Sequence, residues 1–129
     1  MDKFEVLKRY FGYSEFRQGQ EEIIDHILNG RDVLSIMPTG AGKSICYQIP
    51  ALMMEGVALV ISPLISLMKD QVDALVQSGI KAAYLNSSLS AGQYNEVLKR
   101  AVNGAYQIIY AAPERLMTAD FLFLTKQIN

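Results

Sequence analysis

The sequence predicts an α/β protein in which a parallel sheet is flanked by helices. Three observations favour this fold class: short apolar runs alternate with helical patterns, the connections between them are short, and half of the 129 residues are hydrophobic. Strand–helix–strand units of this kind form right-handed crossovers that leave the strands parallel. We expect about one domain with roughly four strands.

Two helices and one strand are expected in the N-terminal third of the chain. The first helix is amphipathic and is expected to end at Gly12, and a second helix over 18–29 is expected to end at Gly30. A short apolar run over 32–37 is typical of a strand.

The rest of the chain alternates between helices and strands. A helix is expected over 43–54, kinked or divided by Pro50. The continuous apolar run over 57–61 predicts a strand that is covered on both faces. The remaining expected elements are a helix over 64–77 that turns Leu67, Val72, Leu75 and Val76 inward, a strand over 82–85, a helix from the cap Ser90 to about 102, a strand over 107–110 and a helix from Thr118.

Composition and charge exclude several classes of protein. With 12 basic and 13 acidic residues the formal net charge is −1, so no basic tail or cationic face indicates nucleic acid or an anionic membrane. The single cysteine, Cys46, can form neither an intramolecular disulfide nor a cysteine zinc cluster. No apolar stretch follows Met1 as in a signal peptide, and polar residues interrupt the apolar stretch over 51–68. We therefore expect a cytoplasmic protein without a membrane segment.

The strongest chemical signal lies between the strand over 32–37 and the helix that follows it. There the sequence reads Met37-Pro38-Thr39-Gly40-Ala41-Gly42-Lys43-Ser44. Glycines let backbone N–H groups point at phosphates, Lys43 reaches the β- and γ-phosphates, and the Ser44 hydroxyl is a ligand for Mg²⁺. This loop predicts binding of ATP or another nucleoside triphosphate with Mg²⁺, although Met37 replaces the first glycine of the general pattern. The alternative is a glycine-rich turn with an incidental Lys-Ser pair.

Further motifs accompany this loop in a fixed order. They are Leu7, Phe11-Gly12-Tyr13, Phe16-Arg17-Gln18-Gly19-Gln20, Cys46-Tyr47-Gln48, the run from Ser62 to Gln71, Leu85-Asn86-Ser87-Ser88 and Ala112-Pro113-Glu114-Arg115-Leu116. With them the chain resembles the RecQ family of ATP-dependent DNA helicases over nearly its whole length, and that family also has methionine at the first loop position. The resemblance implies an adenine-recognition segment over 1–30, followed by an incomplete first RecA-like domain over 31–129.

The resemblance also implies roles for three residues before the phosphate loop. Gln20 would pair with the edge of adenine, and Tyr13 and Arg17 would pack on the plane of the base. These residue types suit the roles, because an amide offers both a donor and an acceptor and flat side chains stack on a base. The alternative is that Tyr13 and Phe16 are core aromatics and Gln20 is an exposed polar residue on a helix.

Two later motifs resemble the DNA-contacting motifs of the same family. The candidate residues are Ser62, Ser66, Lys69 and Arg115. Each motif follows the carboxyl end of a predicted strand, where ligands of open α/β sheets bind. Backbone N–H groups and hydroxyls hold phosphates without much net positive charge, which reconciles DNA binding with the overall charge. The alternative is an ordinary helix cap with solvated polar residues.

One part of the family pattern is missing. In the family a strand ending in Asp-Glu-Ala-His supplies the acidic partner of Mg²⁺ and orients the attacking water, and no Asp-Glu pair follows an apolar strand here. The second RecA-like domain is missing as well, so Lys43 is the one catalytic candidate. We expect an N-terminal fragment of the first motor domain, at most a weak nucleotide binder by itself, whose unpaired strand edges favour self-association.

The parent protein implied by the resemblance couples ATP hydrolysis to 3′–5′ translocation on single-stranded DNA and to duplex unwinding in recombination and repair. Two other hypotheses stay open from the residues alone. One is a stand-alone, non-catalytic nucleotide- or DNA-binding module, and the other is a different phosphate-loop ATPase such as a small-molecule kinase.

Overall fold

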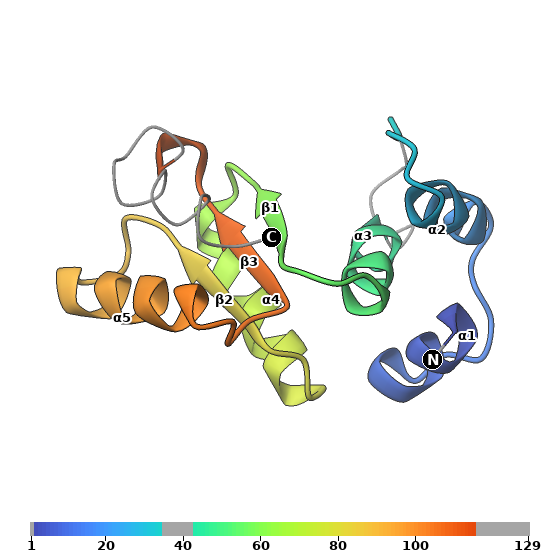
Figure 1. Ribbon diagram of the computed structural model, residues 1–129, viewed down its shortest axis with the longest axis horizontal. Coiled ribbons are helices and arrows are strands. Elements are labelled where there is room, and N and C mark those ends of the chain that lie inside the picture. The colour runs from blue at the N-terminus through green and yellow to red at the C-terminus, as the bar shows by residue number, and fades with distance from the viewer. Residues whose placement is uncertain (1, 35–42, 116–129) are drawn as a thin grey trace. The chain divides into compact units, whose positions relative to one another are not determined.

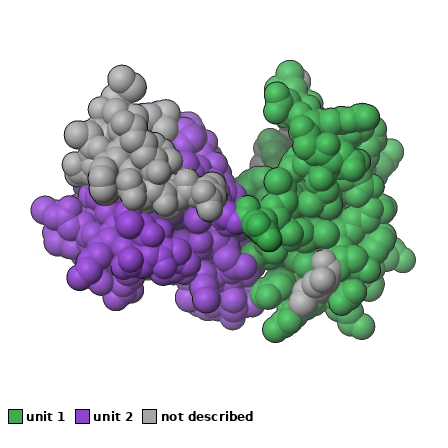
Figure 2. Space-filling model, in the orientation of Figure 1, with its two compact units in different colours: residues 1–55 green, residues 56–129 purple. Residues whose placement is uncertain are grey.

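The computed structural model describes residues 2–34 and 43–115, and the chain forms two compact units, residues 1–55 and residues 56–129 (Figures 1 and 2). Most of the predicted phosphate loop and the helix expected from Thr118 lie outside the described residues.

The first unit is helical where it is described. Its elements are α1 (Lys3–Val6), the π-helix η1 (Leu7–Phe11), α2 (Gln20–Leu28) and α3 (Lys43–Met53). The first two predicted helices are confirmed with their stops, since Gly12 and Gly30 both have φ of 77°, a left-handed conformation that favours glycine after a helix. The core of this unit contains Val6, Leu7, Ile24 and Ile49.

Two expectations for the first unit are corrected. Residues 31–34 belong to no strand, and Leu34 is 92% exposed, so the start of the strand predicted over 32–37 is wrong for the described residues. Pro50 does not divide its helix: α3 runs through it, and the Met54 N–H donates to the Pro50 carbonyl at 2.9 Å. The missing N–H of a proline removes a single bond from the helix, and the buried Pro50 is accommodated within α3.

The second unit contains a parallel sheet, as predicted. Its elements are β1 (Ala58–Ile61), α4 (Ile65–Gln77), β2 (Ala82–Leu85), α5 (Ala91–Val102), β3 (Ile108–Ala111) and the short 3₁₀ helix η2 (Pro113–Arg115). The strand order is β1-β3-β2 and both pairs are parallel. Roughly four strands were expected, and the described residues form three.

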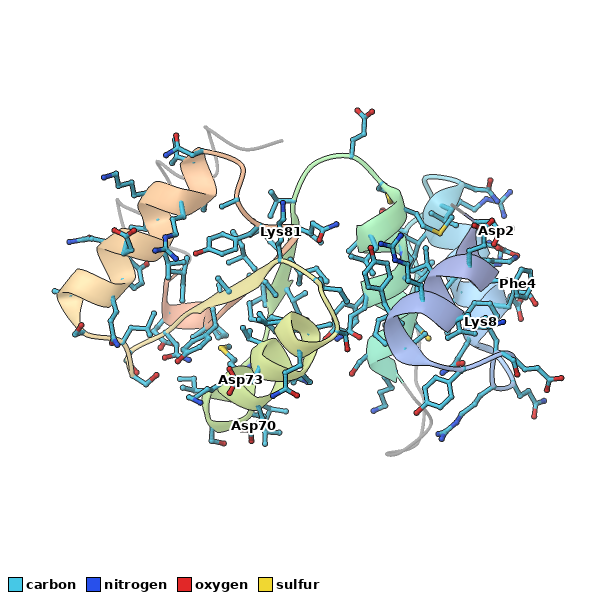
Figure 3. All side chains as sticks on the ribbon, turned by 90° about the horizontal axis from the view of Figure 1, so that it is seen from below. Asp2, Phe4, Lys8, Asp70, Asp73 and Lys81 are labelled. Carbon is cyan, nitrogen blue, oxygen red and sulfur yellow. The ribbon has the colours of Figure 1, made fainter. Side chains whose placement is uncertain are left out.

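The strand order determines where the two long helices lie. From β1 the chain crosses to the far strand β2 and then returns to β3 in the middle. Right-handed crossovers in opposite directions place their helices on opposite faces, and α4 and α5 do cover opposite faces (Figures 1 and 3). On the α5 face, Leu85, Ile109 and Ala111 form one core cluster with residues of α5.

The inward face of α4 differs from the expected one. Val72 and Leu75 are buried as predicted, but Leu67 and Val76 are 47% and 53% exposed, and Met68 is fully buried in their place. Positions 68, 72 and 75 follow the i, i+4, i+7 spacing of one helical face, and this face packs on the sheet.

Strand β1 is also less covered than predicted. Its burial alternates, with Leu59 and Ile61 36% and 43% exposed, so the expectation of cover on both faces is wrong for the described residues. The reason is position: β1 lies at an edge of the described sheet, and its exposed side chains share the face of Ile109 and Ala111. Self-association through such an edge stays a prediction.

The N-terminus of α5 is capped as expected. The Ser90 hydroxyl accepts from the Gln93 N–H at 3.2 Å, and the Gln93 side chain accepts from the Ser90 N–H at 2.9 Å, which completes a capping box.

The revised face of α4 predicts how two neighbouring substitutions differ. Met68→Ala removes a fully buried side chain and is expected to lower the free energy of unfolding by about 2–5 kcal/mol. Leu67→Ala removes a half-exposed side chain and is expected to cost less than about 1 kcal/mol. Urea unfolding of the 129-residue chain measures both. A larger loss for Leu67→Ala than for Met68→Ala would contradict this packing.

Candidate functional site

The N-terminus of α3 carries the described part of the predicted phosphate site. Lys43 is the first residue of the helix and is exposed, and Ser44 follows it half-buried. Helix N-termini present unpaired N–H groups and a partial positive charge, which favour bound phosphate. Thr39, Gly40, Ala41 and Gly42 lie outside the described residues.

The buried thiol of Cys46 lies in the same helix. Burial raises its pKa, and the residue is 6% exposed, so it behaves as a small apolar side chain.

The structure brings two of the three candidate adenine contacts together at the start of α2. Gln20 is the first residue of the helix and is 2% exposed, so the alternative of an exposed polar residue is wrong. Its side-chain oxygen Oε1 accepts from the Arg17 backbone N–H at 2.8 Å, while the Arg17 carbonyl accepts from the Gln20 N–H at 3.1 Å. These two bonds fix the carboxamide of Gln20 relative to the main chain of Arg17.

The two aromatic residues of this segment differ in exposure. Tyr13 is 53% exposed, so it is not a core aromatic. Phe16 is half-buried, packs against the core cluster of the unit, and contacts Phe4 with ring centroids 5.4 Å apart. Tyr13 is therefore the more exposed of the two aromatic side chains on the segment that leads to Gln20.

An ion-pair cluster lies beside this segment and was not predicted from the sequence. Lys3 Nζ lies 2.7 Å from Glu21 Oε2 and 2.6 Å from Asp25 Oδ1. Hydrogen bonds to Asp25 and then Glu21 raise the pKa of Lys3. The spacing of the two acids, four apart on one helical face, was a signal for a shared cation, but its source in α1 depends on tertiary packing.

In the second unit the candidate residues lie at the carboxyl ends of the strands, and we call this end of the sheet the carboxyl edge. Because all three strands are parallel, their carboxyl ends meet there, and the register aligns Ile61, Ala111 and Leu85. Hydrogen bonds continue one residue beyond the strands here: the Ser62 N–H donates to the Ala111 carbonyl and the Ala112 N–H donates to the Leu85 carbonyl, each at 3.1 Å. Ligands of open α/β sheets bind at such an edge.

The predicted DNA contacts lie along the start of α4 and at η2. The Ser62 hydroxyl accepts from the Leu64 N–H at 3.1 Å and so shapes the turn into the helix. Ser66 is exposed in the first turn of α4. Lys69 follows one turn later, but its Nζ pairs with Asp73 Oδ2 at 2.8 Å, and this bond raises the pKa of Lys69. Arg115 is the last residue of η2, at the same edge.

A buried asparagine organises the loop after β2 and was missed as a functional candidate. Asn86 is 1% exposed, its Nδ2 donates to Met68 Sδ at 3.4 Å, and its Oδ1 accepts from the Ser88 N–H at 2.8 Å. The Ser88 hydroxyl donates to the same oxygen. The sequence signal was an Asx turn in Asn86-Ser87-Ser88, but its link to α4 appears only in the fold.

Residues 2–34 and 43–115 contain neither a cluster of metal-ligating side chains nor a helix suited to a membrane. No group of three or more His, Cys, Asp or Glu side chains in these ranges is placed to hold a metal ion. His26 Nε2 instead lies 3.9 Å from Glu22 Oε1, and His26 Nδ1 lies 3.5 Å from Arg31 Nη1. Within the same ranges, no helix has both the length and the apolar character of a membrane span.

Comparison with known proteins identifies relatives of this chain. The ATP-dependent DNA helicase RecQ of Pasteurella multocida is 55% identical over 120 residues, which cover 93% of this chain and 19% of that protein. The RecQ helicase of Bacillus subtilis is 54% identical over 125 residues, 96% of this chain and 21% of that protein. The chain thus spans about a fifth of the length of these curated relatives.

A solved structure and a family model agree with these relatives. The crystal structure of a hypothetical ATP-dependent RNA helicase from Sulfolobus tokodaii matches with a TM-score of 0.70 and 26% identity, over 97% of this chain and 37% of that one. This match confirms the predicted RecA-like α/β fold. The model of the DEAD/DEAH box helicase family matches residues 17–128. The chain therefore belongs to the DEAD/DEAH box helicase family, and it is a homologue of the N-terminal region of RecQ DNA helicases.

Proposed function

We propose that this chain is the nucleotide-binding part of a DNA helicase that couples ATP hydrolysis to 3′–5′ translocation on single-stranded DNA and to duplex unwinding in recombination and repair. The observation that carries the proposal is the exposed Lys43 at the first residue of α3, followed at once by Ser44. Membership of the helicase family adds ATP as the nucleotide. The proposed location is the cytoplasm, where bacterial DNA lies.

The residues at the start of α3 fit a triphosphate and its metal ion. The ammonium of Lys43 neutralises charge on the β- and γ-phosphates, and the backbone N–H groups of residues 39–42 and the helix end hold their oxygens. The Ser44 hydroxyl is the proposed ligand of Mg²⁺, which stabilises negative charge during phosphoryl transfer. In the proposed helicase, the general base and a second RecA-like domain come from outside these 129 residues.

The base of ATP is proposed to bind at the start of α2. Gln20 is the proposed partner of the adenine edge, because a carboxamide offers both a donor and an acceptor and the bond from the Arg17 N–H fixes its position. The exposed ring of Tyr13 and the guanidinium of Arg17 offer flat surfaces for stacking.

DNA is proposed to bind along the carboxyl edge of the sheet. Ser62, Ser66, Lys69 and Arg115 all belong to the turns or helical segments that leave this edge. A DNA strand bound there contacts the first turn of α4, where the backbone N–H groups and the Ser66 hydroxyl can donate hydrogen bonds to phosphate oxygens. Because Asp73 pairs with Lys69, the ammonium of Lys69 attracts phosphate less strongly. Most of the proposed contacts with DNA are therefore hydrogen bonds rather than charge pairs, as the net charge of −1 led us to expect.

The proposed phosphate contact of Lys43 can be tested by substitution. Lys43→Ala removes a charged contact to phosphate and is expected to weaken Mg·ATP binding to the chain at least about tenfold, measured by isothermal titration calorimetry. In the helicase that carries this chain, the same change is expected to abolish ATP-driven unwinding. Lys81→Ala, a matched change of an exposed lysine in the other unit, is expected to alter neither. Unwinding that survives Lys43→Ala would refute the assignment.

A second prediction uses two matched ion pairs to test the DNA edge. Asp73→Asn releases Lys69 and is expected to tighten binding of single-stranded DNA, whereas Lys69→Ala weakens binding and lowers the salt slope by about 1. Glu96→Gln is the control, because it also removes one negative charge from an exposed i,i+4 ion pair, that of Glu96 with Arg100, on the helix α5 that covers the opposite face of the sheet. Fluorescence anisotropy over a salt series measures all three variants.

If DNA binds at the carboxyl edge, Asp73→Asn must increase the affinity for single-stranded DNA more than Glu96→Gln does. Equal gains for Asp73→Asn and Glu96→Gln would mean that net charge alone matters, and this result would contradict a DNA site at the start of α4.

A further inference from the structure

A single lysine ties the two N-terminal helices together. Lys3, the first residue of α1, places its ammonium within 2.7 Å of both Glu21 Oε2 and Asp25 Oδ1, which lie one turn apart on α2. The Lys3 side chain is 18% exposed, against 68% for Lys69 in its ion pair, while the acids Glu21 and Asp25 are 46% and 47% exposed. The N-terminus of α1 is therefore anchored beside the first turns of α2.

The neighbouring residue connects α1 to the segment that leads to Gln20. The ring of Phe4 contacts Phe16 at a centroid distance of 5.4 Å and an interplanar angle of 56°, a tilted geometry that aromatic pairs favour. Lys3 Nζ lies 5.3 Å from the centre of the Phe4 ring, so the lysine also contacts this ring directly. Phe16 precedes Arg17 directly and Gln20 by four residues.

The segment over 12–19 depends on such contacts for its position. It contains neither helix nor strand, and it is bounded by Gly12 and Gly19, whose φ values of 77° and 88° are left-handed. Its contacts include the bond from the Arg17 N–H to Gln20 Oε1 and the packing of Phe16 on Phe4. A loop without a backbone ladder takes its geometry from side-chain contacts of this kind.

We propose that Lys3 is a positioning residue for adenine recognition. By anchoring α1 to α2, Lys3 holds Phe4 against Phe16 and so keeps the next residue, Arg17, in place where its N–H bonds the carboxamide of Gln20. The inference rests on the proposed adenine site, and it adds that selectivity for the base depends on an ion cluster that does not touch the nucleotide. A binding group that is held in place before the ligand arrives gains affinity for the correct ligand.

The test compares ATP with GTP, because the two share the triphosphate and differ in the base. Isothermal titration calorimetry with Mg²⁺ gives the ratio of their affinities for the 129-residue chain. Lys3→Met is expected to lower the preference for ATP about fivefold, which is about 1 kcal/mol, and to leave GTP affinity unchanged. Lys3→Arg keeps the charge and is expected to retain the preference. Lys8→Met is the control, because Lys8 is an exposed lysine on the adjoining helix η1 (Figure 3).

Hydrogen exchange provides a second readout that needs no nucleotide. In Lys3→Met the amides of Arg17 and Gln20 are expected to exchange about fivefold faster, because the segment is no longer held, while amides of β3 keep their rates. Unchanged exchange at Arg17 and Gln20 would overturn the inference.

The outcomes separate this inference from the proposed function. If Gln20→Ala abolishes the preference for ATP but Lys3→Met keeps it, the adenine site stands and the role of Lys3 is wrong. If the unmodified chain shows no preference for ATP over GTP, the adenine site is wrong and the role of Lys3 falls with it.

Discussion

The parallel pairing of β3 between β1 and β2 is the constraint on which the second unit depends. All four residues of β3 are buried, and each has a partner in both neighbouring strands. Because the three strands share one direction, the turn at Ser62, the loop at Asn86 and the segment at Ala112 leave from one edge. The crossovers then bring the N-terminus of α4 to that edge, so its hydroxyls and N–H groups are available to a ligand.

The first unit differs, because its proposed ligand-binding groups lie at helix ends and in a loop rather than along a sheet. Lys43 is the first residue of α3 and Gln20 the first residue of α2, so two of the proposed contacts to ATP lie at helix N-termini. Helix ends are precise supports only where the helices are held together. The apolar cluster around Ile24 and Ile49 supplies most of that support, and the ion cluster at Lys3 adds an anchor at its margin.

Much of this architecture was predictable from the sequence, for local reasons. Alternating apolar runs and helical patterns located the described helices and strands from α2 to β3, although the strand predicted over 32–37 was wrong where it is described. Glycines marked the ends of several helices. The face of α4 was not predictable, because Leu67, Met68 and Val76 are all apolar and only packing on the sheet decides among them. Cover over β1 was overestimated because a continuous apolar run does not reveal that a strand lies at an edge.

The candidate site divides in the same way. Motif spacing pointed to Lys43, Ser44 and Gln20, since these roles depend on short stretches of chain. The burial of Gln20 against the Arg17 main chain was not predictable, because it results from a side-chain bond inside a loop. The contacts of Lys3 with α2 and of Asn86 with Met68 join residues far apart in sequence, and a pattern read along the chain does not reveal them.

The central claim is that this chain holds ATP between the start of α2 and the start of α3. A titration of the isotopically labelled chain with Mg·ATP, followed through backbone amide NMR shifts, tests it most directly. The account predicts that the largest shift changes fall on Lys43, Ser44, Arg17 and Gln20, while the strands of the second unit barely respond. Shift changes confined to residues 56–115, or none at saturating nucleotide, would contradict it.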